Sequence, residues 1–90
     1  REKMDYENDE DFESTALDYD TLLFNYYEYL AVCIHQNLLN EKNVRLYFKN
    51  LLVSVKEHFY EGSFLFKEGY VARKDYSGLR WLFKKWDIEY

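Results

Sequence analysis

The residues able to do chemistry are few in this chain, and their spacing argues against a catalytic or metal site. His35 and His58 are the two histidines, and Cys33 is the single cysteine. Cys33 and His35 are two positions apart, so on a helix they point to different sides and are badly placed to share a metal or to act as nucleophile and base. A zinc site built on cysteines needs more than one thiol. The sequence therefore predicts no catalytic, metal-binding or cofactor-binding residue.

Carboxylates are the remaining candidates for acid–base chemistry. Glu10 and Asp11 are adjacent in a charged stretch, without the fixed, partly desolvated site that general acid–base catalysis needs. Glu28 differs, because it lies in the middle of a helical pattern among three tyrosines. We interpret Glu28 as a structural tie to a Tyr hydroxyl or to a Lys or Arg of a neighbouring helix, since a catalytic acid would need a cleft. The chain is therefore predicted not to be an enzyme.

The elements that carry these residues are predicted to be helices. Ninety residues indicate one domain, and the chain has no proline and three glycines. The composition favours an all-α fold, a small antiparallel bundle of three to four helices with an acidic N-terminal leader. The domain boundaries predicted are a leader or linker at 1–13 and a helical bundle at 14–90.

The first helix is predicted from Ser14 or Thr15 to about Asn37. Thr15 and Asp18 have the spacing of a capping box, and Asp18 and Asp20 suit the positive end of the helix dipole. Apolar residues follow two of its faces, which predicts the central helix of the bundle. One face comprises Leu17, Phe24, Tyr27, Ala31, Ile34 and Leu38, and the other comprises Leu22, Tyr26, Leu30 and Cys33.

A tight turn is predicted to join this helix to a second one. Asn37 suits a left-handed position and Asn40 suits the N-cap of a helix that runs to about Tyr60. Its predicted buried stripe comprises Val44, Tyr47, Phe48, Leu51, Leu52, Val55 and Phe59. A short helix is predicted within 64–74, although an internal glycine lowers the helix propensity of this segment. Ser77 is predicted to cap a last helix over 78–86.

Charge is distributed unevenly along the chain. The first twenty residues hold nine acids against two cations, and the remaining seventy hold ten cations against eight acids. An acidic protein is a poor general binder of nucleic acid or anionic membranes. However, residues 64–86 carry a net charge of +4 with aromatic rings interleaved. This segment leaves open an alternative function, weak binding to nucleic acid or to an anionic membrane surface.

Three segments resemble an uncharacterised bacterial helical domain family, whose members often carry a membrane-spanning helix upstream. They are Leu23-Phe24-Asn25-Tyr26-Tyr27-Glu28, Asn37-Leu38-Leu39-Asn40-Glu41 and Leu79-Arg80-Trp81-Leu82-Phe83-Lys84-Lys85-Trp86. Relatives tend to have Gly-Leu-Ile-Asp-Glu at the second segment, so Asn37 departs from the family glycine. The resemblance implies that a transmembrane anchor can lie before residue 1, with no chemistry to carry over. The single cysteine and the absence of Asn-x-Ser/Thr sites suit a reducing cytosol, so we expect a cytoplasmic domain that such an anchor tethers to the inner face of the membrane.

Aromatic residues give the functional prediction. Ten Tyr, seven Phe and two Trp are more rings than a domain of this size needs for its interior. Tyr and Trp are enriched at protein interfaces, which favours protein–protein binding or a homo-oligomer over catalysis. The candidate interaction residues are Tyr19, Tyr29, Tyr60, Tyr76, Trp81, Lys84 and Lys85.

Overall fold

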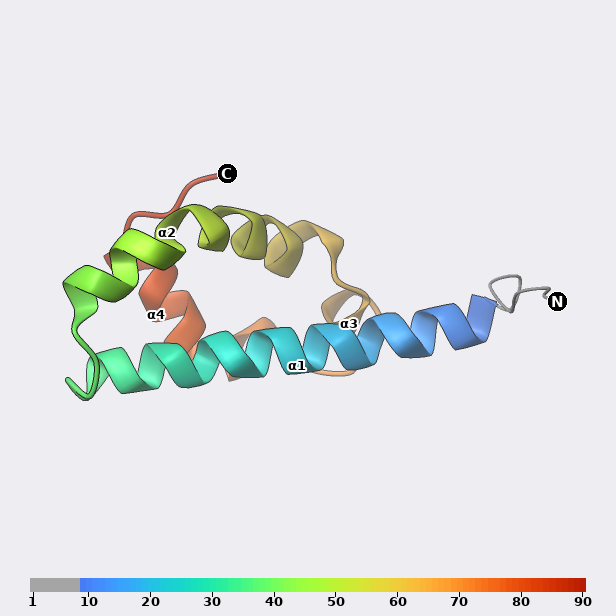
Figure 1. Cartoon of the computed structure of the whole chain (residues 1–90). Coiled ribbons are helices and arrows are strands. Elements are labelled where there is room, and N and C mark those ends of the chain that lie inside the picture. The colour runs from blue at the N-terminus through green and yellow to red at the C-terminus, as the bar shows by residue number, and fades with distance from the viewer. Residues whose placement is uncertain (1–8) are drawn as a thin grey trace, which may run out of the picture.

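Two antiparallel helices joined by a tight turn form the frame of the molecule (Figure 1). The computed structural model describes the backbone of residues 9–90 and the side chains from residue 14 onward. Helix α1 spans Asp9–His35 and α2 spans Glu41–Glu57. Asn37 has a φ of 62°, and the Asn40 side chain accepts a hydrogen bond of 3.2 Å from the Asn43 amide. Both predicted roles, the left-handed turn residue and the N-cap, are confirmed.

The first helix begins earlier than the sequence predicted. Helix α1 starts at Asp9, so Thr15 and Asp18 lie within the helix and the predicted capping box at Thr15 is wrong. Acidic side chains near a helix N-terminus are stabilised by its dipole, which explains why an acidic stretch extends the helix here. Residues 9–13 of the predicted leader are thus helical, and residues 1–8 lie outside the described part of the chain.

The rest of the chain folds in short elements. A π-helical turn at His58–Gly62 follows α2, then come α3 at Phe64–Lys67, a 3-10 turn at Arg73–Asp75 and α4 at Ser77–Lys85. Gly69, with a φ of 79°, lies just after α3, where the helix predicted within 64–74 stops. Residues 9–90 contain no strand, and the predicted small all-α bundle is confirmed.

Helix α1 is the element against which the short helices pack. It packs most extensively against α4 and then against α3, and α4 lies near the joined end of α1 and α2 in Figure 1. The second apolar face predicted for α1 is covered only in part. Leu30 and Cys33 of its second apolar face are buried, but Leu22 and Tyr26 are 71% and 55% exposed.

The core is a cluster of aromatic rings. Phe24 of α1 lies 5.2 Å from Phe59 and 5.9 Å from Tyr76 between ring centroids. Phe59 in turn contacts Phe66 at 4.8 Å and Phe83 at 5.7 Å, all edge to face. Such pairs add stability beyond the area they bury. Much of the aromatic surplus is therefore inside, and Tyr76, predicted to be an interaction residue, is buried in this cluster.

Helix α2 buries a narrower stripe than its pattern predicted. Leu52 and Val55 of α2, and Phe59 of the following π-helical turn, are buried as expected, but Tyr47 is 82% exposed and Leu51 is 51% exposed. The apolar period marks a face of the helix correctly. It does not show how much of that face a neighbouring helix covers.

Alkaline pH is expected to unfold the protein through two core tyrosines. Burial raises the pKa of both Tyr27 and Tyr76 above 10.0, and neighbouring Tyr and carboxyl groups raise it further. The folded state therefore favours their neutral form. The associated stability is complete below about pH 10 and is lost as pH rises through the raised pKa values. In a pH titration followed by circular dichroism, Tyr76→Phe should unfold at higher pH than the parent, whereas Tyr47→Phe should leave the midpoint unchanged.

Candidate functional site

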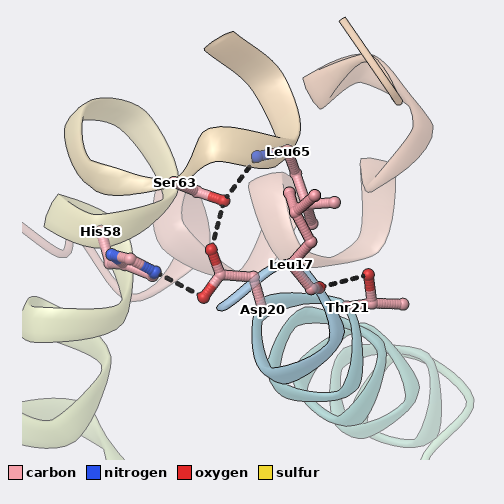
Figure 2. A network of polar contacts seen from close by, with 6 residues as sticks. All are labelled: Leu17, Asp20, Thr21, His58, Ser63 and Leu65. Atoms are coloured by element: carbon pink, nitrogen blue, oxygen red, sulfur yellow. Dashed lines mark hydrogen bonds and ion pairs between the residues drawn. The ribbon is translucent and has the colours of Figure 1, made fainter. Parts of the chain in front are cut away.

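A buried carboxylate links α1 to the segment after α2 (Figure 2). Asp20 is 3% exposed, and its Oδ1 lies 2.7 Å from His58 Nε2. Its Oδ2 accepts a hydrogen bond of 2.6 Å from the Ser63 hydroxyl, whose oxygen accepts one of 3.2 Å from the Leu65 amide. Ser63 thereby caps α3. Asp20 was predicted near the positive end of the helix dipole, but α1 begins at Asp9 and the Asp20 carboxylate bonds to His58 and Ser63 instead.

The network contains Ser, His and Asp, the residue types of a serine hydrolase triad, but they contact one another in a different order. Asp20 stands between Ser63 and His58, so the hydroxyl donates to the carboxylate and not to the imidazole. A serine nucleophile needs a base that accepts its proton, and it must reach a substrate. Ser63 is 1% exposed. A Cβ at Gly62 would lie 2.6 Å from His58 Nδ1, so this glycine gives the ring its room. These contacts hold three segments together.

A second carboxylate caps α4 from a distance. Glu28 of α1 accepts hydrogen bonds from the Gly78 amide at 3.0 Å and the Leu79 amide at 2.7 Å. No side chain within α4 performs this role, and the helix starts at Ser77 with Tyr76 as its N-cap residue. The predicted cap at Ser77 is therefore wrong. Glu28 is a structural tie as predicted, but it bonds to backbone amides and not to a Tyr, Lys or Arg side chain.

The predicted interaction residues near α4 lie close to one another. Trp81 is half-buried, with its ring 4.9 Å from that of His35 and 5.5 Å from Lys85 Nζ. Lys85 also lies 3.7 Å from Glu41. Tyr60 is half-buried and stacks edge-on against Phe59 at 5.0 Å. Lys84 is exposed. Both rings of this set pack against neighbouring side chains and keep part of their surface exposed.

The basic segment 64–86 does not form one continuous patch. Arg73 donates to the Phe59 carbonyl at 3.1 Å and the Tyr60 carbonyl at 2.9 Å, so its guanidinium is occupied within the fold. Lys85 is paired with Glu41. The remaining cations are distributed over α3, the 3-10 turn and α4. Binding to a long polyanion needs many simultaneous phosphate contacts, which this distribution does not favour.

A row of exposed apolar and aromatic side chains lies along α1. Tyr19, Leu22, Tyr26 and Tyr29 are 63%, 71%, 55% and 69% exposed, and we call these four residues the α1 stripe. Tyr19 and Tyr29 were predicted to be interaction residues, whereas Leu22 and Tyr26 were assigned to a buried face. Their spacing of three, four and three residues is that of the a and d positions of a coiled coil. This heptad spacing is the sequence signal that could have identified them.

The α1 stripe lies on a helix segment with no free charge. From Tyr19 to Gln36 the charged residues are Asp20 and Glu28, and both are bonded inside the fold. The exposed side of this segment therefore consists of neutral groups, in a chain that is 32% charged. Charged residues are depleted at the centres of protein interfaces, so this surface has the composition of one.

Comparison with protein-family models, curated proteins and solved structures finds no match to this chain. The resemblance to a bacterial helical domain family stays a prediction. Among the described residues, no helix has an apolar window long enough to cross a membrane. No group of three side chains suited to bind a metal ion occurs in that same part of the chain.

Proposed function

We propose that this chain is a non-catalytic helical module that associates with a second copy of itself through the α1 stripe. The observation that supports this proposal most directly is the exposed, uncharged row formed by Tyr19, Leu22, Tyr26 and Tyr29. Identical stripes with heptad spacing fit each other, because each side chain enters a space between side chains of the facing helix. A two-fold symmetric contact then uses the same patch on both copies.

Electrostatics favours this face for self-association. Each copy carries a net charge of −5, so two copies repel each other at most orientations. The α1 stripe lets them meet without placing like charges at the centre of the contact. Asp18 is exposed at one end of the row, where a rim position keeps its carboxylate in water.

Helix α2 extends the apolar surface beyond the stripe. The four stripe residues span ten helical steps, or about 15 Å, which is short for an interface of roughly 1,000 Å². A groove of about 400 Å³ between α1 and α2 is lined by Tyr19, Leu23, Tyr27, Leu51 and Val55, with Ser54 and His58 at its polar side. The exposed Leu51 therefore continues the stripe across the groove, and we place both helices in the contact.

Two matched pairs of variants test this proposal. The parent is expected to show a mass near twice 11.1 kDa by light scattering behind size exclusion at high micromolar concentration. Leu22→Glu and Tyr29→Glu should each give monomer, because each puts two like charges, one per copy, within a symmetric apolar contact. Leu38→Glu and Tyr70→Glu change side chains that are 65% and 62% exposed outside the stripe, and they should leave the dimer intact.

The salt dependence of dimer formation distinguishes an apolar contact through the α1 stripe from an electrostatic contact. An apolar contact should persist from low to high salt, whereas an ionic one weakens as charges are screened. A parent that stays monomeric at every concentration, or a dimer that Leu38→Glu and Leu22→Glu weaken equally, would contradict the proposal. A dimer that dissociates only at high salt would contradict it as well.

A further inference from the structure

A cationic pocket lies between α2 and α4, and it shares no residue with the α1 stripe. It is an open pocket of about 390 Å³, lined by Lys56, Tyr60, Ser77, Arg80, Trp81, Phe83 and Lys84. Ligand sites of small molecules have volumes in this range. Three of the seven lining residues are cations and none is an acid, although the whole chain is acidic. Lys56 is bonded within the fold, whereas no ion pair of the described residues involves Arg80 or Lys84.

The cations of the pocket differ in how firmly they are held. Lys56 Nζ donates a hydrogen bond of 2.6 Å to the Ile88 carbonyl, which fixes one cation at the pocket wall. Arg80 and Lys84 are exposed, and neither forms an ion pair within residues 14–90. They occupy consecutive turns of α4 on one face, at positions i and i+4, so both can reach one anion. Glu61, an acid of the neighbouring turn, accepts a hydrogen bond from the Tyr90 hydroxyl.

Aromatic side chains form the rest of the wall. Tyr60 and Trp81 are half-buried and come from different elements, one after α2 and the other on α4. A flat ring can stack on such side chains while an attached phosphate meets the cations. Ser77 adds a hydroxyl donor at the first residue of α4. The pocket therefore combines a place for an anionic group with a place for a planar ring.

We propose that this pocket binds a small ligand in which a phosphate is joined to a planar ring, of the class of a nucleoside monophosphate. Arg80 and Lys84 contact the phosphate, and Tyr60 and Trp81 contact the ring. The proposal concerns binding alone and involves no chemical step. It does not depend on self-association, because its residues lie apart from Tyr19, Leu22, Tyr26 and Tyr29.

Tryptophan fluorescence provides the test, since Trp81 lines the pocket while Trp86 is buried outside it. Titration with adenosine monophosphate is expected to quench the emission to saturation, with inorganic phosphate and adenosine alone each at least tenfold weaker. Arg80→Glu with Lys84→Glu should weaken binding by at least tenfold. Lys67→Glu with Lys74→Glu makes the same change in net charge at exposed positions outside the pocket, and it should weaken binding less than threefold.

Three outcomes would overturn the proposal. The first is no saturation up to about 10 mM ligand, a concentration at which association is too weak for a defined site. The second is an equal loss of affinity in both double variants, which would indicate attraction to overall charge. The third is binding of single-stranded oligonucleotides that strengthens with length while the mononucleotide fails to bind. This result would indicate that the cations of the pocket contact a nucleic-acid polymer. Because Trp81→Phe removes the fluorescent reporter of the pocket, the affinity of this variant for adenosine monophosphate is measured by calorimetric titration.

Discussion

Replacement of Asp20 by alanine is expected to lower the free energy of unfolding by about 3 kcal/mol. The substitution removes the hydrogen bond from Ser63 and the contact with His58, and it leaves a hydroxyl that is 1% exposed without its acceptor. Loss of one partner from a buried pair costs about 1–3 kcal/mol, and more where one group is charged. Urea unfolding followed by circular dichroism would measure the loss.

The neighbouring exposed acid serves as the control for this prediction. Asp18→Ala removes the same charge from the same helix two residues earlier, and it should change the free energy of unfolding by less than about 0.5 kcal/mol. Asp20→Asn keeps an acceptor and should give an intermediate loss, which remains measurable if the alanine variant fails to fold. Equal stability of the Asp20 and Asp18 variants would show that the buried network contributes nothing.

Replacement of Glu28 by alanine is expected to cost about 2 kcal/mol, chiefly by loosening α4. Two backbone amides lose a charged acceptor at 2.7 and 3.0 Å. Loss of a helix cap typically costs about 1 kcal/mol, and hydrogen bonds to charged groups contribute more. Thermal and urea unfolding would give the size of the effect, and amide exchange at Gly78 and Leu79 would place it at the start of α4.

Gly78→Ala tests the same contact from the other side. A Cβ at this position would lie 2.7 Å from Glu28 Oε2, so the carboxylate must move away from the amides. In the Glu28→Ala background the added methyl meets no carboxylate, and the two changes should therefore be less than additive. Full additivity would mean that Glu28 does not cap α4.

Local signals explain what could be predicted from the sequence. Asn37 and Asn40 determine a turn within a few residues, so the αα-hairpin and its antiparallel helices followed from side-chain chemistry alone. The absence of proline and the helical period gave the all-α fold. The end of α1 was placed well for the same reason. Its start was not, because an acidic stretch looks alike in a solvated leader and in the first turns of a helix.

Contacts between distant residues explain what was missed. Asp20 meets His58 and Ser63 across 38 and 43 positions, and no local pattern pairs them. The burial of Tyr76 depends on how a loop lies over Phe24 and Phe59. A loop has no hydrophobic periodicity from which this burial could be predicted. The exposure of Leu22 and Tyr26 depends on which side of α1 receives α4. Hydrophobic period alone cannot distinguish an apolar face that the fold covers from one left open.

The N-terminus of α4 is capped by a side chain of α1, so the order of α4 depends on the fold of the rest of the molecule. Nine residues are too few to form a stable helix on their own, and α4 has no side-chain cap of its own. Its acceptor comes from Glu28, 50 residues earlier in the chain. Helix α4 is therefore expected to depend on α1 for its order, through this cap and through the packing of its buried Leu79, Leu82 and Phe83. Local unfolding of α4 should thus merge with global unfolding at this end of the molecule.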